Sequence, residues 1–157
     1  MIEVKIYLAA RYELTTDNDI GGYGYVIKSE NYSSTGVGSY FKTSKDRISM
    51  IGCIAALKDA YKNVGPVISI KIHAKHSETV NNMIYGHCKK FKNLPHQDLV
   101  QHCIGIIRHS WVHTYNMTYN SCEEMKLANK LSKEALKNPD PRRDLLDFKR
   151  SLATPLF

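Results

Sequence analysis

The sequence lacks a long apolar run, and it has little cysteine, tryptophan or acid. No stretch approaches the roughly 20 apolar residues that a membrane-spanning helix needs, which argues against an integral membrane protein. The four cysteines form no Cys-x-x-Cys pair, so neither a disulfide framework nor a structural zinc site is expected. No basic segment precedes the apolar residues of the N-terminus, and we therefore expect a cytoplasmic protein without a signal peptide.

Acidic residues are outnumbered, since 15 Asp and Glu stand against 22 Lys and Arg and give a formal net charge of +7. Such an excess favours an anionic partner, because each phosphate that Lys or Arg neutralises releases condensed counterions. The 157 residues, 43% of them hydrophobic, suit one domain with a single core. A soluble protein with a nucleic-acid partner is the first hypothesis.

Hydrophobic periodicity predicts a mixed α/β chain. Alternating or β-branched runs predict strands over residues 3–9, 22–28, 34–42, 67–72 and 111–114. Helical spacing of apolar residues, with caps and breakers, predicts helices over residues 47–62, 79–91, 97–107 and 122–136. This order predicts an antiparallel meander that leads into a parallel crossover.

Four stretches of the sequence share a pattern with a known family. They are Ile6-Tyr7-Leu8-Ala9-Ala10, Gly21-Gly22-Tyr23-Gly24, the segment Thr43 to Leu57, and Trp111-Val112 followed by Cys122-Glu123-Glu124. In this order they resemble the ribonuclease H family over residues 2–137. The resemblance implies a ribonuclease H-like fold, a five-stranded mixed sheet flanked by helices. It also implies a domain at residues 1–137, followed by a basic and apolar tail at 138–157.

Members of that family cleave with two Mg²⁺ ions held by clustered carboxylates. The resemblance assigns three of the acid positions to Ala9, Ser49 and Ala74, none of which can replace a carboxylate. A fourth acid position is occupied by Glu123, and one carboxylate cannot hold two metal ions. We therefore expect a catalytically inactive domain with no metal and no cofactor.

Several alternatives remain open at these positions. His73 or His76 could occupy the third acid position in place of Ala74, and Glu123 with Glu124 could simply form a favourable acidic first helical turn. The opposite alternative is a metal-dependent nuclease with a rearranged carboxylate site. Such a site would use Glu123, Glu124, Asp19 and Asp46.

Basic residues flank two of the predicted helices. Lys42, Lys45 and Arg47 lie near the start of the first helix, and the end of the second carries Lys89, Lys90 and Lys92. The resemblance implies that these six bind the backbone of a nucleic-acid duplex, although a solvated lysine face explains them equally well. A protein partner is the other candidate, and the oligomeric state stays open. A small degenerate domain of this kind also suggests, by association, a viral or mobile-element source.

The tail from residue 138 is too apolar for an idle terminus. Its predicted partner-binding residues are Leu145, Phe148, Leu156 and Phe157. We expect the tail to order on a partner rather than on its own domain, although packing back remains possible after the break at Pro139 and Pro141. On that hypothesis, deletion of residues 139–157 leaves the melting temperature within a few degrees.

Overall fold

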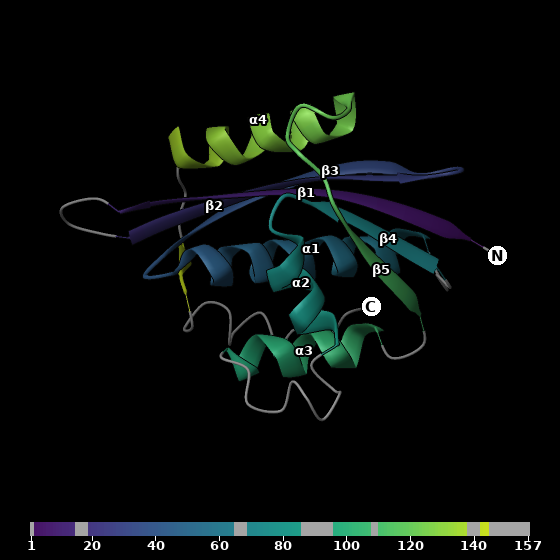
Figure 1. Cartoon of the computed structure of the whole chain (residues 1–157), viewed down its shortest axis with the longest axis horizontal. Helices are drawn as coiled ribbons and strands as arrows, with labels where there is room; N and C mark the ends of the chain where they lie inside the picture. Colours follow the sequence, from purple (N-terminus) through teal and green to yellow (C-terminus); the bar gives the residue numbers. More distant parts are fainter. Residues whose placement is uncertain are drawn as a thin grey trace.

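A mixed six-stranded sheet separates helix α4 from helices α1, α2 and α3 (Figure 1). The computed structural model describes residues 2–14, 19–64, 69–85, 96–107, 110–137 and 142–144. The strands are β1 (Glu3–Leu14), β2 (Asp19–Ser29), β3 (Ser33–Phe41), β4 (Ser69–Ala74), β5 (Trp111–Asn116) and β6 (Arg142–Arg143). The helices are α1 (Lys45–Val64), α2 (Ser77–Ile84), α3 (Gln97–Ile107) and α4 (Glu123–Lys137).

The strand order β5-β4-β1-β2-β3-β6 combines an antiparallel meander with parallel crossovers. β1, β2 and β3 pair antiparallel, whereas β4 pairs parallel with both β1 and β5. The predicted α/β fold and its five strands are confirmed. Residues 142–143, within the segment assigned to the tail, add a short sixth strand parallel to β3.

The first hairpin is longer than its sequence pattern predicts. β1 continues past residue 9 to Leu14, because Arg11 to Leu14 pair with Asp19 to Gly22 across the hairpin. The alternation of apolar and polar residues fades over this part, and strand pairing rather than burial maintains the extended backbone.

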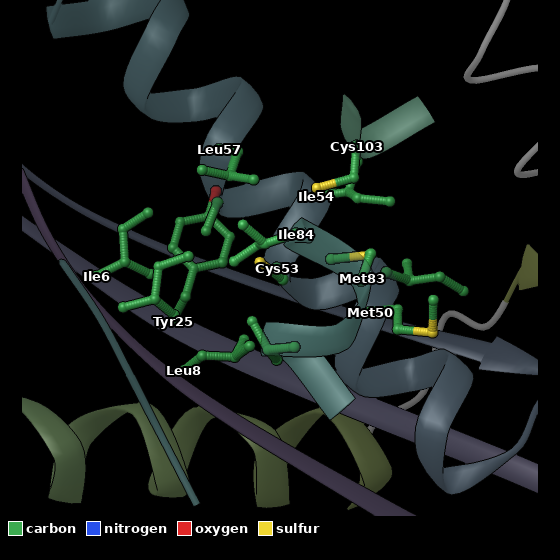
Figure 2. Close-up of a cluster of buried hydrophobic side chains, with 14 of the residues drawn as sticks. Ile6, Leu8, Tyr25, Met50, Cys53, Ile54, Leu57, Met83, Ile84 and Cys103 are labelled. Atoms are coloured by element: carbon green, nitrogen blue, oxygen red, sulfur yellow. The ribbon is translucent and has the colours of Figure 1, made fainter. Parts of the chain in front are cut away.

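The main core lies between the sheet and helices α1, α2 and α3 (Figure 2). On β1, Val4, Ile6 and Leu8 are buried on this side and pack with residues of α1 and α2. Figure 2 shows Ile6 and Leu8 facing Ile54, Met83 and Ile84, which are at most 2% exposed. Each such side chain contributes about 1.5–3 kcal/mol of transfer free energy. No described helix has the length and apolarity needed to cross a bilayer.

Helix α4 packs directly on the backbone of β2, where two glycines leave room for it. A Cβ added to Gly24 would lie 2.5 Å from the carbonyl oxygen of Ala128 and 2.6 Å from Cβ of Leu131. A Cβ on Gly22 would approach the carbonyl oxygen of Ser132 to 3.0 Å. Gly22 and Gly24 of the Gly-Gly-Tyr-Gly motif are therefore packing requirements for α4, whereas Gly21 lies against Ile48 and Thr43.

Two groups of hydrogen bonds stabilise helix α1, one at each end. At its start, the backbone N–H of Arg47 donates to Oγ of Ser44 at 3.2 Å, a typical N-cap bond. Near its end, the carboxylate of Asp59 accepts four hydrogen bonds of 2.7–3.0 Å, from Tyr25, Tyr32, Ser34 and Asn63. The second group joins α1 to β2 and β3.

Candidate functional site

Ala9 and Ala74, the positions expected to correspond to two metal ligands, face opposite sides of the sheet. Ala74 pairs with Leu8 and belongs to the main core beside α1 and α2. Ala9, one residue further along β1, belongs to a small cluster beneath α4. Both side chains are at most 3% exposed. The two positions therefore do not converge on one solvent-accessible site.

The other two positions are also unsuited to metal binding. Ser49 is 2% exposed, and its hydroxyl donates to the carbonyl oxygen of Lys45 at 3.1 Å. The side chain of Glu123 is 88% exposed and forms an ion pair of 3.2 Å with Lys126, one turn further along α4. Two Mg²⁺ ions need several oxygen ligands in one place, and these residues do not fit that requirement.

The acids of the alternative site are not gathered into a ligand set. Asp46 accepts a hydrogen bond of 3.2 Å from the hydroxyl of Thr79, and Asp19 begins β2 opposite Leu14. Over the described ranges, no three side chains of His, Cys, Asp or Glu lie close enough together to hold a metal ion.

Cations lie beside the end of β4, where the pairing of β1 with β4 stops. The ring of Tyr119 has the guanidinium of Arg11 at 5.5 Å and the ammonium of Lys75 at 5.0 Å from its centroid. Both distances fall within the range of cation–π attraction. The Tyr119 hydroxyl donates to the carbonyl oxygen of Ala10 at 3.1 Å, which fixes the ring against β1.

Lys45, at the start of α1, joins this positive region beside His76. The pKa of His76 is lowered by burial first and then by the charges of Lys45 and Lys75, while Asp46 opposes the shift. The imidazole is therefore neutral at pH 7, and Lys45 and Lys75 lie close enough to act on it. We call Arg11, Lys45 and Lys75 the cationic cluster.

The predicted nucleic-acid-binding residues have different surroundings. Lys42 and Lys45 are exposed, and Lys42 has a left-handed backbone with φ of 56° where β3 turns into α1. Lys89, Lys90 and Lys92 lie outside the described residues, as do the tail residues Leu145, Phe148, Leu156 and Phe157.

The assignment of Arg47 to a nucleic-acid surface needs correction. Its side chain is 13% exposed, and its guanidinium donates two hydrogen bonds to Asp98 and two to Asp144, all of 2.8–3.0 Å. Burial lowers the pKa of Arg47, but the hydrogen bonds and charges of the two carboxylates outweigh burial and raise it. Because both sides of the guanidinium are paired, Arg47 is not available to a phosphate.

Sequence reasoning gave Arg11 no role, and it considered Tyr119 only as one of several tyrosines suited to an interface. Tyr119 reaches Ala10 across 109 positions, and no local pattern indicates such a contact. Arg11 gave a weak signal against a metal site, because it directly follows Ala9 and Ala10 and a cation there would repel a metal ion.

Comparison of the sequence alone gives no relatives, since neither a family model nor a curated protein matches it. Comparison of structures finds proteins of similar fold. The N-terminal RNase H domain of Rv2228c from Mycobacterium tuberculosis is 17% identical, with a TM-score of 0.67 over 87% of this chain and 95% of that one. RNase H1 from Halobacterium salinarum is also 17% identical, with a TM-score of 0.62 over 86% of this chain and 98% of the other.

A foamy viral protease-reverse transcriptase in complex with an RNA/DNA hybrid shares the fold as well. It is 13% identical, with a TM-score of 0.59 over 83% of this chain and 19% of that chain. At these identities the likeness shows the fold alone. The predicted ribonuclease H-like fold is thereby confirmed.

Proposed function

We propose that this chain is a cytoplasmic, noncatalytic ribonuclease H-like module that binds a nucleic-acid duplex through its cationic cluster. The observation that carries the proposal is a cluster of cations beside positions that lack carboxylates. Ala9 and Ala74 are buried without ligand atoms, and the buried Ser49 hydroxyl is bonded to the carbonyl oxygen of Lys45. Arg11 lies on β1, Lys75 directly follows β4, and Lys45 begins α1.

Cations at this position favour a metal-free contact with phosphate. Lys and Arg bind phosphate oxygens directly, and such contacts position a duplex without reading its sequence. The foamy viral relative was solved with an RNA/DNA hybrid, which supports a duplex as the partner. The same match supports a viral or mobile-element source as part of the proposal.

A cleavage assay and a binding titration on one RNA–DNA hybrid test the proposal together. We expect no cleavage above background with Mg²⁺ or Mn²⁺, and binding that weakens steeply with salt. Metal-dependent cleavage that disappears in Glu123→Gln would instead establish the alternative, a nuclease with a rearranged site.

Charge-reversal variants identify the contact surface. The double variant Lys45→Glu and Lys75→Glu removes two phosphate contacts, so the slope of log K against log salt should become shallower by about 1.8. The control Lys130→Glu and Lys133→Glu changes the net charge equally on the exposed side of α4 and should leave the slope unchanged. Replacement of Lys89, Lys90 and Lys92 by Glu should weaken binding to all sequences alike. Equal effects of test and control would show that net charge, and not this surface, determines binding.

A further inference from the structure

Three stacked rings cross the sheet on the side of α4. Tyr7, His73 and Tyr115 are paired neighbours on β1, β4 and β5. The ring of His73 lies between the two tyrosines, with centroid separations of 5.0 and 5.3 Å and interplanar angles of 17° and 24°. These separations match the spacing of about 4.8 Å between neighbouring strands, so the rings stand upright on the sheet.

The row ends in an open aromatic face at the edge of the sheet. β5 is the last strand in the sheet order, and Tyr115 is 43% exposed. Because His73 covers one face of the Tyr115 ring, the other face is directed away from the sheet. Trp111 stands on the same side of β5, about 13 Å from Tyr115, and is 70% exposed.

A row of basic residues, three lysines and a histidine, runs beside the aromatic row, two residues closer to the start of β1. Lys28, Lys5, Lys71 and His113 are paired neighbours across β2, β1, β4 and β5, so their side chains share this side of the sheet. Burial and the charges of Lys5 and Lys71 lower the pKa of His73, which places both lysines near the rings. The opposing carboxylates are Glu3, 3.5 Å from Lys71, and Glu124, whose charge acts on Tyr7.

We propose that this side of the sheet binds single-stranded nucleic acid, with a base stacked on Tyr115, a second on Trp111 and the backbone on Lys5, Lys28 and Lys71. Exposed rings beside a line of lysines are the combination by which proteins hold single strands, because every base has a π-face and every nucleotide a phosphate. These residues differ from those of the cationic cluster. The inference therefore stands apart from the duplex binding proposed above.

A groove of about 470 Å³ lies between α2, α3 and β5 and is less suited to nucleic acid. Its lining residues include Ile84, Ile104 and Ile107, together with Trp111 and His113 at the edge of the sheet. Its lining includes no Lys or Arg among the residues that the structure describes. Charge complementarity therefore favours the open side of the sheet as the nucleic-acid surface.

Fluorescence of the full chain tests the inference directly, because Trp111 is the only tryptophan in the sequence. Titration with a twelve-nucleotide oligothymidylate should quench Trp111 in a saturable manner. Tyr115→Leu should weaken binding about tenfold, as expected for the loss of one stacked base. Lys5→Gln with Lys28→Gln should make the salt slope shallower by about 1.4, and Lys130→Gln with Lys133→Gln should not change it. Thermal melts establish that each variant is folded.

The outcomes separate this inference from the duplex proposal. Lys45→Glu with Lys75→Glu should weaken the hybrid and leave the oligothymidylate unaffected, whereas Tyr115→Leu should do the reverse. Absence of binding to the single strand overturns the inference, even if the hybrid binds. Binding that is unaffected by Tyr115→Leu and by the Lys5 and Lys28 variant overturns it as well.

Discussion

The paired guanidinium of Arg47 makes Asp144 a strong determinant of stability, and Asp144→Asn tests this. The Asp144 side chain is 1% exposed and accepts from Nε of Arg47 at 2.8 Å and from Nη2 at 2.9 Å. Asparagine keeps the shape but removes the charge, which leaves the buried guanidinium with one carboxylate partner, Asp98.

Removal of one partner from a buried ion pair costs about 3–5 kcal/mol. Arg47 keeps two hydrogen bonds to Asp98, and the amide oxygen of the substituted side chain can still accept one, so we expect a loss of roughly 2–3 kcal/mol in the free energy of unfolding. For a chain of this length the loss corresponds to a fall of about 4–12 °C in the melting temperature.

Asp98→Asn is the matched control, since it removes the other carboxylate of the same guanidinium. The Asp98 side chain is 27% exposed, so water replaces part of the lost interaction and the cost should be roughly 1 kcal/mol or less. Calorimetric or urea-induced unfolding measures both variants. Equal losses, or an Asp144→Asn melting temperature within a degree of the parent protein, would refute the reasoning.

Three further outcomes follow from the packing and from the hydrogen bonds. Because Asp144 lies in the tail and is paired with Arg47, we now expect deletion of residues 139–157 to destabilise the chain, in place of the small change expected from sequence. A chain that ends at residue 138 should lose at least as much stability as Asp144→Asn, whereas one that ends at residue 146 should melt near the full-length chain; equal melts of the two would rule out a role for Asp144. Gly24→Ala should destabilise the domain by about 1–3 kcal/mol, because its Cβ would meet the α4 backbone, and Gly105→Ala, whose Cβ meets nothing within 4 Å, should not. The pKa of Asp98 is lowered first by its hydrogen bonds to Arg47, and that of Asp59 is lowered because the hydrogen bonds from Tyr32, Tyr25, Asn63 and Ser34 outweigh burial. The stability that each carboxylate contributes is present above its unfolded pKa of about 4 and is lost as pH falls through its lower pKa in the folded state. The melting temperature should therefore fall below a pH of about 4, and Asp59→Asn should make that fall smaller.

The fold could be predicted from sequence because its signals are local. Apolar spacing in residues 47–62, the cap at Ser44 and the run of β-branched residues before Ile72 each specify an element without knowledge of distant contacts. The interpretation of Ala9 and Ser49 as acid positions without an acid depended instead on the resemblance to the ribonuclease H family, and it stays a prediction.

The roles of individual charges could not be predicted, because their partners are far away in the chain. Arg47 meets Asp98 and Asp144 at separations of 51 and 97 residues, and nothing near Arg47 distinguishes it from the exposed Lys45. Strand β6 could not be predicted either, because two residues carry too little pattern to indicate a strand. The alternation of Trp111, His113 and Tyr115 was a local signal for an aromatic strip along one side of β5.

The opposite orientations of Ala9 and Ala74 have a consequence for protein engineering. An aspartate introduced at Ala9 would enter the apolar cluster with Met125 and Ala128, and one at Ala74 would enter the main core. Each carboxyl would be buried without a partner, and its pKa would rise until it remained protonated at neutral pH. Introducing acidic residues at these two positions would thus produce a less stable protein with no metal site. A designer who wanted cleavage from this scaffold would first have to change the packing of both layers.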